Sequence, residues 1–259
     1  MIAQTEKERH TLREGGKRLA RVLRLVAEIV KPGVTTSELN ELAEKLIRDG
    51  GDTSAFLHYT PDGVKKPYPA TLCVSVNDEI VHGIPNEHPR TLVKGDIVGL
   101  DCGLTHNGLI LDSAVTVSVG KIDSSAQKLI KVTKEALSVG IAAARVGNTI
   151  GDIGHAIESF AKPYGYGIVR ELGGHGVGKR VHEEPSIPNY GTPGSGMKLI
   201  SGMVLALEPM LNEGTENITL DSDGYTFKTA DGKISAHFEH TILVTDGEPE
   251  ILTIEFPTK

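Results

Sequence analysis

Four acidic residues stand inside apolar, strand-like runs of this sequence, where acidic side chains are rarely buried unless they are paired. They are Asp101, Asp112, Glu208 and Glu239. Carboxylates that converge on one pocket need protons or cations, because two unit charges 4 Å apart repel by about 4 kcal/mol at an effective dielectric of 20. Two divalent cations balance four carboxylates and can activate a water molecule between them. The pattern therefore favours a two-metal site over a pair of acids that share a proton.

A predicted hairpin relates the first two acids to each other. Asn107-Gly108 is a strong signal for a two-residue turn, with His106 and Leu109 as the flanking pair. In that register Gly103 faces Asp112, and Asp101 lies on the same face, diagonal to Asp112. Diagonal neighbours are about 7–8 Å apart at the backbone, a gap that two carboxylates can close around shared cations.

Three of the ten histidines have an informative context. His175 lies in the run GGHGVG (173–178), which predicts a loop that a ligand can approach closely. Lys179 stands where the third glycine of a dinucleotide fingerprint would fall, so the run is not that motif. His82 and His182 lie at predicted strand ends or turns. A lone histidine in a turn is usually solvated, which remains the alternative for these two.

The elements that must position these side chains form an α+β pattern. Helical periodicity and capping signals predict helices at 6–30, 35–50, 124–145 and 149–161, and short β-type runs occupy 71–81, 96–100, 109–119, 203–207 and 238–244. With an offset of 114, residues 31–39 lie over 145–153 in the shared pattern basic, any, Gly, any, Thr, any, any, acid, aliphatic. This match indicates an internal duplication, with a central cleft between two halves, although a common helix-turn-helix pattern is the alternative.

Composition excludes several classes of protein. The 259 residues carry 27 basic and 34 acidic side chains, a net charge of −7 without a basic block, so we expect no nucleic-acid or anionic-membrane surface. No run approaches the length of a membrane span. The two cysteines predict reduced thiols rather than a disulfide framework.

The combined motifs resemble the type I methionine aminopeptidases, which belong to the pita-bread metallopeptidases. The matching segments are VNDEIVHGIP (76–85), the hairpin with Asp101 and Asp112, GHGVG (174–178), HEEP (182–185), LEPM (207–210) and FEHT (238–241). The resemblance runs in the same order over nearly the whole chain. It implies a pita-bread fold, in which two pseudo-symmetric halves (about 10–120 and 121–250 of one domain, 1–259) surround a mostly antiparallel sheet with helices on its outer face.

The resemblance also implies the roles of individual residues. It implies that two divalent ions (Co, Mn, Fe or Zn) are held by Asp101, Asp112, His175, Glu208 and Glu239. A water or hydroxide between the ions would attack the scissile carbonyl, with Glu208 as general base and with His82 and His182 as catalytic residues that contact the substrate. The reaction would remove the N-terminal methionine from peptides and nascent proteins with a small second residue.

The methionine side chain would enter a pocket whose composition departs from the family pattern. By resemblance its walls are Tyr68, Cys73, Val181 and Tyr225. Val181 and Tyr225 replace larger aromatic residues that are common in the family, and the loop 60–69 is longer than usual, which implies a wider or differently polar pocket. Some family members also bind a monovalent cation, near the positions of Asn77, Glu79 and Ser235.

The resemblance further implies a cytoplasmic monomer that acts on nascent chains at the ribosome exit. One alternative is another pita-bread peptidase of the Xaa-Pro type, although those usually carry a large extra N-terminal domain. The other is a non-catalytic binding protein on the same scaffold, which retention of all five ligands disfavours.

Overall fold

The predicted α+β architecture is present in the computed structural model, which describes residues 1–61, 63–64 and 66–254. The helices are α1 (Glu6–Glu28), α2 (Thr36–Asp49), α3 (Ser124–Ala143) and α4 (Ile150–Ala161), with a 3₁₀-helix at Lys162–Tyr164. The strands are β1 (Thr53–Ser54), β2 (Leu72–Val76), β3 (Glu79–Val81), β4 (Ile97–His106), β5 (Leu109–Ser118), β6 (Gly167–Ile168), β7 (Gly173–Gly176), β8 (Glu183–Pro188), β9 (Val204–Leu207), β10 (Met210–Asn212), β11 (Ile218–Leu220), β12 (Phe227–Thr229), β13 (Ser235–His237), β14 (Glu239–Leu243) and β15 (Glu250–Ile251).

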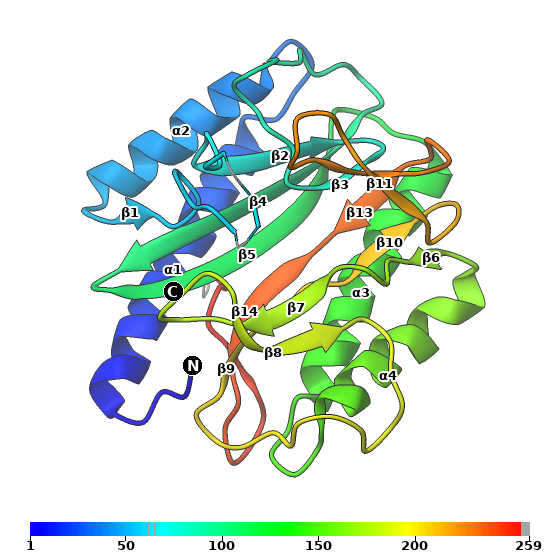
Figure 1. Cartoon of the computed structure of the whole chain (residues 1–259). Coiled ribbons are helices and arrows are strands. Elements are labelled where there is room, and N and C mark those ends of the chain that lie inside the picture. The colour runs from blue at the N-terminus through cyan, green and yellow to red at the C-terminus, as the bar shows by residue number, and fades with distance from the viewer. Residues whose placement is uncertain (62, 65, 255–259) are drawn as a thin grey trace.

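The main sheet is antiparallel at every pairing between its described strands. Its order is β1-β4-β5-β14-β9-β7-β8, with β2 beside β4 and β15 beside β14. Helix α1 packs on β4 and β5, whereas α3 packs on β9, β13 and β14. Figure 1 shows α1 and α3 behind the strands of the sheet, with α2 and α4 beside them towards the edges of the view.

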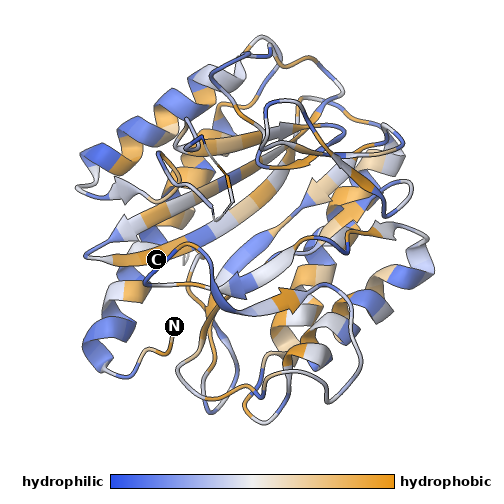
Figure 2. Ribbon diagram, in the orientation of Figure 1, coloured by the Kyte–Doolittle hydropathy of each residue, from blue (hydrophilic) through white to orange (hydrophobic). Residues whose placement is uncertain are grey.

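Apolar faces hold the helices against the sheet. The buried residues of α1 recur at helical spacing, from Leu12 through Leu19 and Leu23 to Val26. Hydrophilic and hydrophobic patches alternate along the same helices in Figure 2, as expected of elements with one face in water. None of the described helices combines the length and the apolar character that a membrane crossing needs.

The two helix pairs begin in the same way, at positions 114 residues apart. Thr35 and Thr149 are the N-caps of α2 and α4. The Glu38 carboxylate accepts hydrogen bonds from the Thr35 amide and hydroxyl at 2.7 and 2.8 Å, and Asp152 accepts the same two bonds from Thr149 at the same distances. The glycine two residues before each cap is also left-handed, with φ 94° at Gly33 and 92° at Gly147.

The β4–β5 hairpin has the predicted register. His106 pairs with Leu109 and Gly103 with Asp112, around Asn107 and Gly108, which both have positive φ. The two predicted acids of the hairpin therefore lie on one face of the sheet, as the sequence indicated.

Strands β5 and β14 form a seam between the two halves of the chain, and side-chain hydroxyls extend it. Glu239 pairs with Ala114 at its centre. On one side of this pair, the Thr241 hydroxyl accepts from the Asp112 amide (2.9 Å) and donates to the Asp112 carbonyl (2.7 Å). On the other side, Thr116 makes the same two bonds with His237, at 2.9 and 2.7 Å. The seam thus has a local two-fold symmetry that relates Asp112 to His237.

Two sequence predictions differ from the structure. The run 71–81 divides into β2 and β3, because Asn77 adopts φ 59° between them. The expected loop at 173–178 is partly strand β7, paired with β8 and β9. Glycine-rich sequence has low strand propensity, but tertiary pairing overrides it here: a Cβ on Gly174 would lie 2.3 Å from the Ala206 carbonyl oxygen. Only a residue without a side chain allows that approach.

Candidate active site

The five predicted metal ligands come from different strands and meet in one small cavity. Asp101 lies on β4, Asp112 on β5, His175 on β7, Glu208 directly after β9, and Glu239 at the start of β14. All five line a cavity of about 60 Å³, together with His82 and His182. Asp112 and Glu239 are only 3% and 2% exposed. Residues more than 100 positions apart are therefore assembled by the sheet.

The centre of this cavity has the spacing of a metal site. One ligand atom each of Asp112, His175 and Glu239 lies within 4.8 Å of the other two. Buried carboxylate oxygens there have no hydrogen-bond partner within the described ranges, namely Asp101 Oδ1, Asp112 Oδ1 and Glu239 Oε1. Buried acceptors normally have partners, so these oxygens indicate a site for a cation.

Electrostatics support the same conclusion. Burial raises the pKa of Asp101 to about 7, and burial followed by the Asp101 charge raises the pKa of Asp112 and of Glu208. The pKa of Glu239 is raised by burial and then by the charges of Asp112, Glu208 and Asp101. Without positive charge, this cluster holds protons; divalent cations would replace them.

The tautomer of His175 is fixed by its own chain. Its Nδ1 lies 2.9 Å from the Gly176 carbonyl oxygen, which can only accept a hydrogen bond. The proton therefore sits on Nδ1, and the Nε2 lone pair faces Glu208 Oε1 at 3.4 Å. Burial also lowers the pKa of His175 to about 3, which keeps the ring neutral. A lone pair facing a carboxylate oxygen is a favourable arrangement when a proton or a metal ion lies between them.

The donor set therefore fits divalent metal ions. Four carboxylates and one imidazole form an oxygen-rich set that suits Mn, Fe or Co better than a closed structural zinc site, which prefers thiolates and imidazoles. The two cysteines are free and buried, as predicted. Cys73 lines the same cavity.

Two further predicted histidines border the cavity. His82 follows β3 with φ 61°, a left-handed conformation that costs a non-glycine residue about 1–3 kcal/mol. Burial, and then the charge of His182, lowers the pKa of His82 to about 4. Burial also lowers the pKa of His182. The ring centroids of His175 and His182 are 4.5 Å apart, so both rings lie at the same cavity wall as neutral imidazoles near pH 7.

The cavity of the predicted ligands also has an apolar lining. Tyr68, Cys73, Val181 and Tyr225 all line it, and each is less than 7% exposed. The Tyr68 and Tyr225 rings meet edge to face with centroids 5.2 Å apart. Tyr68 donates to the Gly83 carbonyl at 2.9 Å, and Tyr225 donates to the Lys66 carbonyl. Both phenol hydroxyls are thus bonded to backbone carbonyls, and the apolar rings form the wall of the cavity.

The sequence prediction missed three residues of this pocket, namely Phe56, Tyr59 and Pro61. Phe56 belongs to the same apolar cluster as Val181, so the small side chain at 181 does not leave an open pocket. The Tyr59 hydroxyl lies 2.9 Å from His182 Nδ1. Phe56 and Tyr59 precede the loop 60–69, and Pro61 lies within it. Asp62 and Lys65 of this loop lie outside the described residues. An aromatic pair before a Pro- and Gly-containing loop was the available signal.

The residues expected near a monovalent cation are also neighbours. The Ser235 amide donates to the Asn77 carbonyl at 2.8 Å. Asn77 donates from its side chain to Asp96 at 2.9 Å, and the Glu79 carboxylate accepts from the Val76 amide at 2.8 Å.

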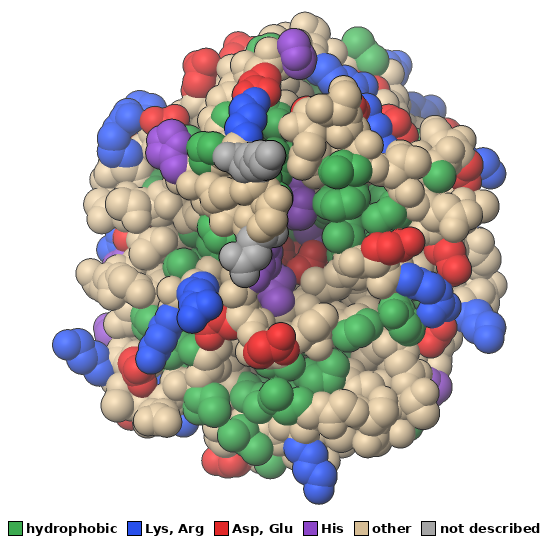
Figure 3. Space-filling model, in the orientation of Figure 1, with side chains coloured by type: hydrophobic (Ala, Val, Ile, Leu, Met, Phe, Trp, Pro, Cys, Tyr) green, Lys and Arg blue, Asp and Glu red, His purple; other side chains and the backbone are tan. Residues whose placement is uncertain are grey.

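A groove of about 490 Å³ leads away from the predicted ligands. His82, His175, His182 and Glu208 line both this groove and the smaller cavity, and Gly173, Gly174, Glu184 and Ser186 line the groove alone. Figure 3 shows the entrance as a hollow near the centre of this face, with histidine and acidic side chains inside. The acids and histidines are therefore reachable from solvent on this side of the molecule.

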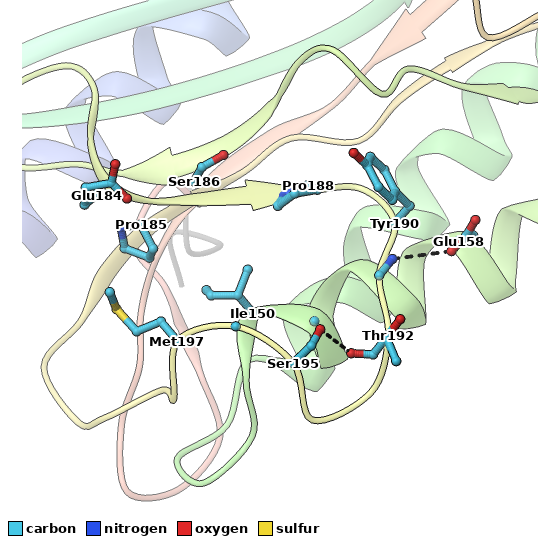
Figure 4. Close-up of a pocket in the computed structure, with 13 residues that line it drawn as sticks. Ile150, Glu158, Glu184, Pro185, Ser186, Pro188, Tyr190, Thr192, Ser195 and Met197 are labelled. Atoms are coloured by element: carbon cyan, nitrogen blue, oxygen red, sulfur yellow. Dashed lines mark hydrogen bonds between the residues drawn. The ribbon is translucent and has the colours of Figure 1, made fainter.

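A second groove, of about 630 Å³, lies between β8 and the start of α4 (Figure 4). Its walls include Ile150, Pro185 and Met197. Two acids line it, Glu158 and Glu184. Glu158 is already bonded to the Gly191 amide (3.4 Å) and to Arg170 (3.3 Å). Although this groove is larger, the grouped donors of a catalytic centre lie in the smaller cavity.

A mostly antiparallel sheet that gathers four buried acids and a neutral histidine beside an apolar pocket defines a metal-dependent hydrolase. Residues 10–246 match the model of metallopeptidase family M24. The chain therefore belongs to metallopeptidase family M24.

Similar proteins carry a more specific name. A methionine aminopeptidase of Clostridium acetobutylicum is 43% identical over 254 residues, which cover 98% of this chain and 99% of the relative. Methionine aminopeptidase 1 of Bacillus subtilis is 41% identical, with the same coverage. The crystal structure of the methionine aminopeptidase from Thermotoga maritima superposes with a TM-score of 0.91 at 40% identity, covering 98% of this chain and 99% of that one.

The expected pita-bread fold is confirmed by these neighbours. A prolidase from Pyrococcus furiosus also superposes, with a TM-score of 0.77, but at 22% identity that likeness concerns the fold alone. This chain covers 65% of the prolidase. The chain is thus a metallopeptidase that uses divalent metal.

Proposed function

We propose that this protein removes the N-terminal methionine from peptides and proteins with a small second residue. The observation that carries the proposal is that one cavity is lined both by the acid and histidine cluster and by apolar side chains. Full-length relatives at 41–43% identity bear the same name. A charged amine at the cluster, with an unbranched apolar side chain in the pocket, matches an N-terminal methionine.

We propose that Asp101, Asp112, His175, Glu208 and Glu239 hold two divalent ions. When bound, such ions polarise a carbonyl, lower the pKa of a water molecule and bind the substrate amine. The choice among Co, Mn, Fe and Zn, and a monovalent cation near Asn77 and Ser235, are finer parts of the same proposal.

The chain's own residues then move the protons. Glu208 is the base: its Oε1 lies at the ligand cluster, and its carboxylate borders the outer groove. From there it can accept the proton of the attacking water and pass it to the leaving amine. His82 and His182, both neutral, donate N–H groups to the scissile amide and its developing oxyanion.

Tyr59 lies against the ring of His182. Its phenol hydroxyl, 2.9 Å from Nδ1, can donate to that nitrogen, and the ring proton is then on Nε2. His182 is then a donor at its free end, as oxyanion stabilisation requires.

The test is a peptide assay with metal titration. Protein freed of metal with a chelator is expected to leave Met-Ala-Ser intact, and added Mn, Co or Fe is expected to restore methionine release. N-acetylated Met-Ala-Ser and a peptide with leucine in second place should resist. An Ala-Pro peptide separates this activity from the Xaa-Pro alternative. No release under any metal condition would refute the proposal.

The variant Glu208→Gln provides the matched control. It keeps the shape of the side chain but removes the base, so we expect kcat to fall by about 10²–10⁴-fold. The fold, measured by circular dichroism, should be unchanged. Near-normal turnover of this variant would show that Glu208 is not the base.

The proposal also covers the domain organisation, the cellular location and the oligomeric state. We propose one domain, 1–259, whose halves, about 10–120 and 121–250, arose by duplication; the matching caps at Thr35 and Thr149 support this. We also propose a cytoplasmic monomer that acts on nascent chains near the ribosome exit, as the bacterial relatives suggest. Sedimentation and ribosome-pelleting experiments test these two points.

A further inference from the structure

His237 is a buried histidine that the mechanism above does not use. It ends β13, two residues before Glu239, and is 3% exposed. Its Nε2 is fully buried and has no hydrogen-bond partner among the described residues. A buried nitrogen without a partner is unfavourable, so its position requires an explanation.

The acidic group beside this nitrogen is Glu208. His237 Nε2 lies 3.6 Å from Glu208 Oε2, just beyond hydrogen-bond distance. The other oxygen of the same carboxylate, Oε1, faces His175 Nε2 at 3.4 Å. Glu208 therefore lies between two imidazoles, of which only His175 belongs to the predicted metal ligands.

The backbone of His237 is held firmly in this place. The Thr116 hydroxyl accepts from the His237 amide and donates to its carbonyl, at 2.9 and 2.7 Å. The local two-fold symmetry of the β5–β14 seam relates this position to Asp112. From this position its ring reaches the carboxylate of Glu208, one of the five predicted ligands. The ring is thus directed at the predicted metal centre, not at a distant part of the core.

We propose that His237 is a positioning residue for Glu208: its Nε2–H holds Oε2, so that Oε1 stays directed at the metal ligands. This inference rests on the proposed function. A side chain that orients a metal-binding carboxylate commonly changes metal affinity or activity 10–100-fold when it is removed. His237 itself touches neither substrate nor metal in this arrangement.

The test compares His237→Leu with His237→Gln. Leucine removes the N–H donor, and we expect kcat on Met-Ala-Ser to fall 10–100-fold while KM changes less than about threefold. Calorimetric titration of the metal-free protein with Mn is expected to show affinity weakened by about 10-fold or more. Glutamine can donate from its amide near the same point, and should restore both values to within about threefold of wild type. If His237→Leu does not fold, His237→Met takes its place.

His240→Leu is the matched control. His240 lies on β14, and its Nδ1 is bonded to the Thr253 hydroxyl at 2.9 Å, away from Glu208. Its loss should leave kcat and Mn affinity unchanged. The inference would be overturned if His237→Leu kept the kcat and the Mn affinity of the wild type. It would also be overturned if the Leu and Gln variants lost kcat and Mn affinity equally. If the wild type itself released no methionine, the proposed function would fail, whereas the Mn titrations would still test the contact between His237 and Glu208.

Discussion

Replacing Asp101 by Asn should stabilise the metal-free protein, and should do so increasingly as the pH rises. Asp101 is 8% exposed and faces Asp112 in a cluster of acids. Burial raises its pKa from 3.8 to about 7. The unfolded chain therefore releases the Asp101 proton near pH 4, whereas the folded chain keeps it until about pH 7.

The sign and size of the effect follow from this difference. The contribution of Asp101 to stability is fully present below pH 3.8 and is lost as the pH rises through about 7. Each pKa unit corresponds to 1.36 kcal/mol, so the whole loss is about 4 kcal/mol, of which about 2–3 kcal/mol falls between pH 5 and pH 8. His82 and His175 have lowered pKa values, which give a pH dependence of opposite sign. Their contribution is common to both proteins and cancels in the comparison.

Scanning calorimetry in the presence of a chelator measures the effect. A loss of 2–3 kcal/mol corresponds to about 5–10 °C in Tm for a chain of this size. The Tm advantage of Asp101→Asn over wild type should grow by that amount from pH 5 to pH 8. Added Mn should raise the Tm of wild type and do little for the variant. Parallel Tm curves for the two proteins over this pH range would refute the charge argument.

Three further substitutions test other parts of the site. Tyr59→Phe removes the hydroxyl that orients His182, and kcat should fall about 10-fold with an unchanged KM for Met-Ala-Ser; an unchanged kcat would contradict that role. Gly174→Ala places a methyl group against the Ala206 carbonyl, 2.3 Å away, and should cost about 1–3 kcal/mol, seen as a Tm lowered by about 3–10 °C. Val181→Phe inserts a ring into a cavity of about 60 Å³, so KM should rise about 10-fold or more; unchanged KM would show that methionine binds elsewhere.

Local pattern was sufficient to predict the elements that carry the acids. The Asn107-Gly108 turn determines the β4–β5 register, because a two-residue hairpin allows one pairing. Acids inside apolar runs indicated a cation site, since burial of such groups needs compensation. The start of α2 followed from the capping box of Thr35 and Glu38.

Other features depend on contacts that sequence spacing does not contain. Strand β7 was expected as a loop because its glycines lack strand propensity, and only its neighbours β8 and β9 explain it. The same limit applies to His237, which has no informative sequence context but lies 3.6 Å from Glu208. Its place depends on the pairing of β13 with β10 and of β14 with β5, and on the bonds that Thr116 makes to its backbone.

The hydroxyl bonds that extend the β5–β14 seam have a consequence for how such enzymes diversify. Thr116 and Thr241 each clasp a residue of the opposite strand through both its amide and its carbonyl. Serine at either position would keep the hydroxyl, whereas valine would leave a buried amide and carbonyl unpaired, and neither threonine is a predicted ligand. Substitution of Thr241 would therefore alter how Asp112 is held against the second half of the chain, while the chemistry of the ligands stayed the same. Substitutions at these two threonines could therefore adjust the metal centre without changing any of its ligands, both in evolution and in protein engineering.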